Sequence, residues 1–105
     1  MSFIIIYTTY PNMEEAKKVT SHLLQKKIIA CANFFPIISS FWWKGKIDNS
    51  NEIVALLKTK KENWEKVKSE IKKIHSYETP CIMKLDVEAN KDYEDWINKE
   101  TKNFN

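Results

Sequence analysis

The stretch IACANFFPIISSFWWK, residues 29–44, is the longest β-type run in the chain and decides how the rest can fold. It carries no charge before its last residue, and at about 3.3 Å per residue it would reach roughly 50 Å as an extended strand. Gly45 follows it in a turn, and residues 52–58 (EIVALLK) return as a second strand. These two runs predict a long antiparallel hairpin.

Upstream of the hairpin the pattern predicts one strand and one helix. Residues 3–9 (FIIIYTT) form a continuous β-rich run, which is typical of a central strand. Pro11 closes a turn, and Asn12 with Glu15 three residues later is an N-terminal helix cap. Apolar residues then recur at helical spacing as far as residues 26–27, where the helix should end.

Downstream of the hairpin the pattern predicts a helix, a strand and a second helix. Thr59 and Glu62 form another capping box, and the helix that follows should stop before Pro80. The apolar face of that helix consists of Trp64, Val67, Ile71 and Ile74. Apolar and charged residues alternate over residues 83–88, which predicts a strand with one wet face. A terminal helix starts at Asn90 and carries Tyr93, Trp96 and Ile97.

The predicted order of elements is therefore β-α-β-β-α-β-α. Crossover connections are right-handed, so two β-α-β units that share a hairpin interleave. This predicts an α+β, ferredoxin-like split β-α-β fold with strand order 4-1-3-2, in one domain over residues 1–105. The hairpin strand is about twice as long as the first strand, so half of the hairpin should overhang the sheet.

An overhanging hairpin with apolar side chains and an unpaired edge would aggregate unless another chain covered it. We therefore predict a closed homo-oligomer, with the interface on the hairpin. The expected interface residues are Phe34, Phe35, Ile37, Phe41, Trp42 and Trp43. The alternative is that these side chains fill the core of a single protomer.

Composition excludes several classes of function. Gly45 is the only glycine, so neither common glycine-rich phosphate loop can be written. All 17 basic residues are lysine, which removes the two-pronged guanidinium grip on phosphate or guanine. The formal net charge is +3, and the lysines read as solvated helix faces, so we expect no nucleic-acid partner.

Other features bear on location and stability. The longest uncharged stretch, residues 28–43, is interrupted by polar residues and is too short to cross a bilayer as a helix, so no membrane partner is expected. The N-terminus does not resemble a secretory signal, and two cysteines make no disulfide framework; both favour a reducing, cytoplasmic location. Few glycines, short turns and an oligomer predict a thermostable protein.

The segment HSYETPC, residues 75–81, is the candidate functional site. Within seven residues it places an imidazole, a phenol, a carboxylate and a thiol, which are side chains that ligate metals or move protons. The predicted topology brings it next to Thr8 and Thr9 at the end of the first strand. An ordinary helix-ending turn, in which the histidine bonds a carbonyl, is the alternative. Cys31 is predicted at the opposite end of the sheet, either as a buried structural thiol or with a separate role.

Taken together, these motifs resemble the CutA family of divalent-cation-tolerance proteins. The matching segments are YTTYP (7–11), ACAN (30–33), WKGK (43–46), Glu52 followed by Lys58-Thr59, HSYETP (75–80), and Tyr93 with Trp96. They span essentially the whole chain in the right order. The resemblance implies a ferredoxin-like homotrimer similar to PII signalling proteins, linked to metal tolerance and reported to bind copper, with no established catalytic activity.

The resemblance also assigns metal donors, with departures. It places the copper-associated histidine on His75, an acid that follows the Tyr-x-x-Pro turn on Cys81, and a strand-one cysteine on Thr8. A thiolate in place of a carboxylate favours Cu(I) or zinc, whereas the lost cysteine removes a ligand. Expected metal ligands are thus His75 and Cys81, with Glu78 as a further donor and Cys31 as an outlying one.

The functional prediction is a non-enzymatic homotrimer with no catalytic residue and no required cofactor, which binds copper or another divalent metal in the response to metal ions. The alternative is a trimeric scaffold or PII-like signalling module that binds a small molecule or an unknown partner protein in its intersubunit clefts.

Overall fold

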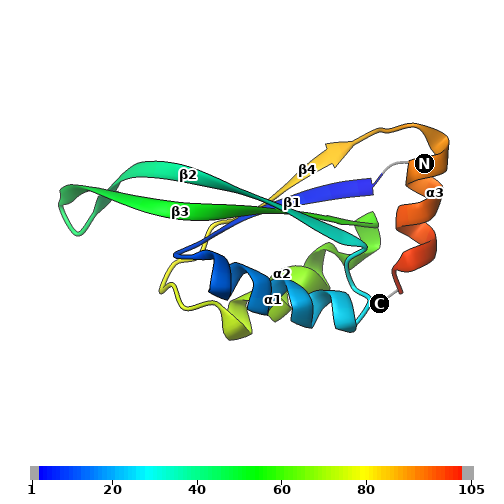
Figure 1. Cartoon of the computed structure of the whole chain (residues 1–105), viewed down its shortest axis with the longest axis horizontal. Helices are drawn as coiled ribbons and strands as arrows, with labels where there is room; N and C mark the ends of the chain where they lie inside the picture. The colour runs from blue at the N-terminus through cyan, green and yellow to red at the C-terminus, as the bar shows by residue number, and fades with distance from the viewer. Residues whose placement is uncertain (1–2, 103–105) are drawn as a thin grey trace.

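The computed structural model describes residues 3–102, so residues 1–2 and 103–105 of the predicted domain lie outside the described residues. The elements are β1 (Phe3–Tyr10), α1 (Met13–Gln25), β2 (Cys31–Trp43), β3 (Lys46–Thr59), the 3-10 turn η1 (Lys61–Asn63), α2 (Trp64–Ile74), β4 (Ile82–Val87) and α3 (Lys91–Glu100). This order confirms the predicted α+β succession (Figure 1).

Within residues 3–102 the strands form an antiparallel sheet in the order β2-β3-β1-β4, which is the predicted order. Helices α1 and α2 lie together on one face of the sheet, and α3 stands at the end where β1 begins (Figure 1). The core lies between the sheet and the two helices. Its most buried members include Ile4, Ile6, Val19, Leu23, Leu57, Val67 and Ile71.

The opposite face of the sheet, here called the open face, is apolar at its centre. Strand register places Met83 opposite Tyr7 and Leu85 opposite Ile5 on this face, where Met83 is 50% and Leu85 54% exposed. One wet face was predicted for this strand, but within the protomer residues of both faces of β4 are exposed. The charged Lys84 points to the helix side instead, with its ammonium 5.8 Å from the ring of Trp64.

The hairpin overhang is confirmed. β2 and β3 pair along their whole length, from Cys31 opposite Lys58 to Trp43 opposite Lys46, whereas β1 pairs with β3 only as far as Ile53. The far half of the hairpin therefore projects beyond the helices (Figure 1). β3 begins six residues before the predicted start, because the antiparallel backbone ladder continues through the polar segment that follows the turn.

The hairpin turn explains the position of the single glycine. Lys44 and Gly45 both have positive φ, at 51° and 81°, as a two-residue turn of the tightest hairpin class requires. That turn matches the right-handed twist of the strands, and glycine adopts its backbone without strain. The turn between two long strands is thus fixed by only two residues.

The first capping prediction is confirmed and the second is wrong. Asn12 Oδ1 accepts the backbone N–H of Glu15 at 2.8 Å, as predicted for α1. Thr59, however, belongs to β3, and its hydroxyl donates to the carbonyl of Ile28 at 2.7 Å. The buried Asn63 precedes α2, and its side-chain amide donates to Thr59 Oγ1 at 3.2 Å and to the carbonyl of Lys102 at 2.7 Å. Thr59 is therefore used to join distant segments and not to cap a helix.

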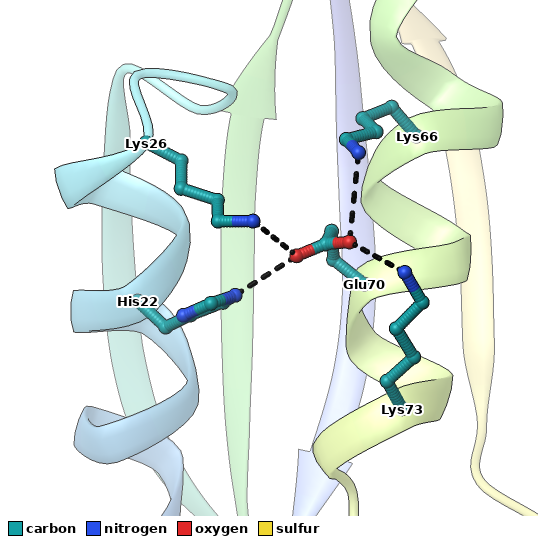
Figure 2. Close-up of polar contacts among 5 residues, drawn as sticks. All are labelled: His22, Lys26, Lys66, Glu70 and Lys73. Atoms are coloured by element: carbon teal, nitrogen blue, oxygen red, sulfur yellow. Dashed lines mark hydrogen bonds and ion pairs between the residues drawn. The ribbon is translucent and has the colours of Figure 1, made fainter.

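A carboxylate shielded from solvent links the two helices. Glu70 of α2 is only 4% exposed. His22 of α1, and Lys26 directly after the end of α1, donate to one of its oxygens at 2.9 and 3.0 Å. Lys73 and Lys66 lie 3.1 and 3.6 Å from the other oxygen (Figure 2). The hydrogen bond from His22, followed by those from Lys26 and Lys73, holds the pKa of Glu70 well below its usual range.

Candidate functional site

The segment after α2 folds back onto the end of β1, as the topology predicts. His75 Nε2 contacts the carbonyl oxygen of Thr9 at 2.7 Å, and its ring stacks on Tyr10 with centroids 4.6 Å apart. The His75 side chain is fully buried. The candidate histidine is therefore part of the packing between the helix layer and the sheet end.

Hydrogen bonding assigns the state of the His75 ring. The backbone N–H of Tyr77 donates to Nδ1 at 3.1 Å, so Nδ1 carries the lone pair and Nε2–H donates to Thr9. The Glu15 carboxylate lies 3.6 Å from Nδ1 and accepts two bonds from Ser76. Both ring nitrogens are thus engaged, and a metal ion at either one would have to displace an existing bond.

A second carboxylate, Glu52 of β3, ties the segment to the hairpin. Glu52 is 8% exposed, and the Tyr77 hydroxyl donates to its Oε2 at 2.7 Å while the Ser39 hydroxyl donates to Oε1. Burial, followed by the hydrogen bond to Glu52, raises the pKa of Tyr77 above its ordinary value. The phenol therefore stays protonated and keeps the segment next to β3.

Cys81 is a half-buried free thiol within the electrostatic influence of Glu52. Burial is the larger cause and the negative charge of Glu52 the smaller cause of its raised pKa. Glu78, the third residue predicted here, is exposed to solvent. The structure thus brings His75 and Cys81 to one end of the sheet and leaves Glu78 on the surface.

The remaining predicted donor, Cys31, lies at the other end of the open face, and its Sγ is 3.6 Å from the hydroxyl of Tyr93. Over residues 3–102 no group of three or more His, Cys, Asp or Glu side chains has the arrangement of a metal site. No helix in the same range is long and apolar enough to span a membrane.

The hairpin carries most of the predicted interface on its surface. Exposed fractions are 39% for Phe35, 38% for Phe41, 72% for Trp42 and 39% for Trp43, and Ile37 is half-buried. Phe34 instead packs against the protomer's own core. Where the hairpin leaves the domain, it forms one wall of a groove of about 520 Å³, and the turn between β1 and α1 forms the other.

Comparison with known proteins identifies the family. Residues 4–100 match the model of the CutA1 divalent ion tolerance protein. The chain belongs to the CutA family. A divalent-cation tolerance protein CutA from Pyrococcus horikoshii is 45% identical over 100 residues, which are 94% of this chain and 98% of that protein.

Solved structures of this family share the fold. CutA1 from P. horikoshii superposes with a TM-score of 0.91 at 45% identity, over 94% of this chain and 98% of the other. The periplasmic divalent cation tolerance protein CutA from Archaeoglobus fulgidus gives 0.92 at 43% identity, over 97% and 100% of the two chains. The PII-like protein CutA from Nostoc gives 0.89 at 27% identity, over 99% and 100%. The CutA and PII-like fold predicted from the motifs is confirmed.

Two features of the site were missed in the sequence. Glu52 was noted only as a family position, although it is a lone acid at the edge of an apolar β-run, which is a signal for a partnered carboxylate. The role of Tyr10 in stacking on His75 had no signal in the local pattern, because the two residues are distant in sequence and meet only in the folded chain.

Proposed function

We propose that this CutA family member is a homotrimer that binds copper or another divalent metal ion and acts in the response to such ions, without enzymatic activity. The observation that supports metal binding is the half-buried Cys81 thiol in the field of the Glu52 carboxylate. This environment opposes a bare thiolate but favours a cation beside it, and a soft divalent ion would displace the thiol proton. His75 and Glu78 stay predicted ligands of the same ion.

The trimer is supported by two uncovered apolar surfaces. No helix of the protomer covers either face of the far half of the hairpin, and Trp42 is 72% exposed there. The open face exposes half of Met83 and Leu85 on the edge strand β4. Covering both surfaces with neighbouring copies would remove apolar area from water and protect two sheet edges. Light scattering on a size-exclusion column should give three times the protomer mass, and a stable monomer would contradict the proposal.

Calorimetric titration tests the metal proposal. The assembled protein is titrated with Cu(II), with Cu(I) under reductant and with Zn(II), beside a metal analysis of the protein as purified. Cys81→Ser should weaken binding of the soft ions most, because it removes the thiolate. Glu78→Gln tests whether the exposed carboxylate is a further ligand, and His75→Gln tests whether the buried ring is a ligand. Unchanged affinity in a His75→Gln, Cys81→Ser double variant would refute the ligand assignment.

A second candidate function is a PII-like scaffold that binds a small molecule or a partner protein. The supporting observation is the groove beside the hairpin, whose apolar lining includes Met13, Ile37 and Ile38 and whose polar lining includes Asn12 and Asn51. A thermal-shift screen of metabolites and nucleotides tests it, and the absence of any stabilised sample would count against this function.

A cytoplasmic location stays a prediction that fractionation would test, since the Archaeoglobus relative is described as periplasmic.

A further inference from the structure

The outer surface of the helix layer carries a concentration of lysine side chains. Four of the eight residues 66–73 in α2 are lysine, and only Glu70 among them is an acid. Glu70 is 4% exposed, whereas the side chains of its partners Lys26, Lys66 and Lys73 are 45%, 33% and 65% exposed. Figure 2 shows this cluster between the two helices, with the sheet behind it. The single carboxylate balances one of three ammonium charges, so the solvent side of the cluster is positive.

A groove of about 430 Å³ lies beside this cluster on the surface of α2. Its lining consists of Glu65, Lys68, Ser69, Lys72 and Lys73. Because Lys73 lines the groove and also lies 3.1 Å from Glu70, the groove and the cluster form one continuous surface. Lys68 pairs with Glu65 at 3.0 Å, but Lys72 has no hydrogen bond or ion pair among residues 3–102. The basic face is defined here as Lys26, Lys66, Lys68, Lys72 and Lys73.

The basic face stays in solvent in the trimer proposed above. That trimer covers the far half of the hairpin and the open face, whereas α1 and α2 lie on the opposite side of the sheet (Figure 1). The basic face is also separate from the groove beside the hairpin, whose lining includes no lysine. A partner of the assembled protein therefore has access to it.

The spacing of the lysines favours carboxylates that are carried on an extended peptide. Lys68 and Lys72 are four residues apart in a helix, which places their Cβ atoms about 5–6 Å apart. In an extended chain every second side chain points to the same side, at intervals of about 6.6 Å. Alternate acidic residues of such a chain would therefore meet successive lysines along the groove. Pairing of lysine with carboxylate is already the chemistry of this surface, in Lys68–Glu65 and Lys73–Glu70.

The same surface lacks the features that concentrate donors on a phosphate group. The chain has no arginine, so the two-pronged guanidinium grip on phosphate is missing. Backbone N–H groups in the body of α2 bond within the helix and form no cradle for an anion. An acidic peptide thus fits the basic face better than a nucleic acid does.

We propose that the basic face is a docking surface for an acidic segment of a partner protein, bound in extended form along the groove of α2. Carboxylates of the segment pair with Lys68, Lys72 and Lys73, and Lys26 and Lys66 extend the positive surface towards α1. The surface belongs to a single protomer and shares no residue with the candidate metal ligands. This proposal therefore stands independently of the proposed metal binding and of the proposed trimer.

Fluorescence anisotropy of a labelled model peptide provides the test. The full-length, assembled protein is added to a rhodamine-labelled peptide of about eight residues in which glutamate alternates with alanine, which is long enough to pass the groove. A peptide with glutamine in place of glutamate is the uncharged control and should not bind. Raising the ionic strength from about 0.01 M to about 0.15 M should weaken binding of the glutamate peptide about tenfold, because the Debye length falls from about 30 Å to about 8 Å. A single-stranded oligonucleotide of equal charge should bind more weakly than the glutamate peptide.

Variants of exposed residues locate the binding surface. Lys72→Gln should weaken binding of the glutamate peptide about twofold to threefold and Lys72→Glu about tenfold, because a favourable charge is first removed and then reversed. Glu65→Gln removes the acid from the groove and should strengthen binding about twofold. Lys99→Glu is the matched control: Lys99 on α3 is exposed and has no ion pair among residues 3–102, as for Lys72. It should leave the affinity within about twofold of wild type.

Circular dichroism of each variant shows that the fold persists, and opposite effects of Lys72→Glu and Glu65→Gln cannot both come from a loss of structure. The proposal is overturned if the glutamate peptide does not bind at low ionic strength, or if Lys72→Glu changes its affinity no more than Lys99→Glu does. It is also overturned if the oligonucleotide binds more tightly than the glutamate peptide, since the basic face would then be a nucleic-acid surface.

Discussion

The carboxylate between α1 and α2 offers the sharpest test of what holds the helix layer together. Glu70→Gln keeps the shape of the side chain and removes its charge. Lys26 and Lys73 would then lose the carboxylate that they share, and one amide oxygen would replace two carboxylate oxygens. We expect the variant to fold but to be clearly less stable.

The size of the stability loss in Glu70→Gln follows from the exposure and position of the side chains that pair with Glu70. Lys26 and Lys73 are 45% and 65% exposed, so the carboxylate is covered by flexible side chains and not by apolar core, and screening is strong. The two bonds across the helices, from His22 and Lys26, contribute about 1 kcal/mol each, and the pairs within α2 about 0.3–0.5 kcal/mol each. Glu70→Gln should therefore cost about 2–3 kcal/mol per protomer.

Urea unfolding, monitored by circular dichroism, measures this cost. Urea is uncharged, so it does not screen the ion pairs of Glu70 as guanidinium chloride would. With a slope of roughly 1–2 kcal/mol per molar urea, the midpoint should fall by about 1–2 M at fixed protomer concentration. Glu65→Gln is the matched control, because Glu65 lies on the same helix and pairs with Lys68 at 3.0 Å but is 76% exposed. It should cost less than about 0.5 kcal/mol. Equal losses in both variants, or no loss in Glu70→Gln, would refute the reasoning.

The pH dependence gives the same test a second readout. The folded pKa of Glu70 is lowered, so its stabilisation is fully present above the unfolded value of about 4.3 and is lost progressively as pH falls below it toward the folded pKa. Glu70 itself should therefore contribute a constant difference in the free energy of unfolding between wild type and Glu70→Gln from pH 6 to pH 8. This difference should shrink below about pH 4. A difference between the two proteins that vanished already near pH 6 would contradict the assignment of this stabilisation to the Glu70 carboxylate.

Four further outcomes are expected. Asn63→Ala removes an amide that donates to Thr59 and Lys102, and should cost about 2–3 kcal/mol in urea unfolding because buried acceptors lose their donor; a loss below about 0.5 kcal/mol would contradict this. Burial raises the pKa of Tyr10 to about 12, so the unfolded chain loses this proton first and stability should fall above pH 10; Tyr10→Phe should abolish that part of the fall in alkaline melts. Trp42→Glu places a charge on the hairpin and should lower the mass measured by light scattering, whereas an unchanged mass would move the interface elsewhere. The melting temperature of the assembled protein should lie well above the roughly 45–65 °C of ordinary domains, and calorimetry giving a value near 50 °C would contradict the prediction of thermostability.

The fold was readable from the sequence because its elements have strong local signals. The β-rich residues 3–9, the Asn12 cap and the aromatic hairpin strand each predict their own conformation, and handedness then leaves few topologies. The helix cap predicted at Thr59 was wrong because the same Ser/Thr-x-x-Glu pattern also occurs at the end of a strand. There the threonine hydroxyl bonds a residue distant in sequence, here the carbonyl of Ile28. The alternation in β4 was read correctly as a strand, but the periodicity does not say which face of a sheet receives the helices.

The candidate site was readable only in part. Chain order places His75 and Cys81 at the end of β1, and the structure has them there. The hydrogen bonds that occupy both nitrogens of His75, and the position of Glu52 between the hairpin and Tyr77, depend on side chains separated by up to 66 residues. No local pattern encodes such pairs, so the sequence indicates the donor types but not whether they are free to bind.

The two-residue turn at Lys44–Gly45 also has a consequence for the order in which the protein matures. Pairs along β2 and β3 are close in sequence near that turn, so the hairpin can zip up early, before any encounter with another copy. In the trimer proposed above, the exposed tryptophans of the hairpin stay in solvent until another copy covers them, and that encounter is an intermolecular step whose rate falls with dilution. The yield of correctly assembled protein should therefore depend on the rate of synthesis. At a low rate the hairpins stay uncovered by another copy, and at a high rate incompletely folded chains associate incorrectly, so the yield should be highest between these limits.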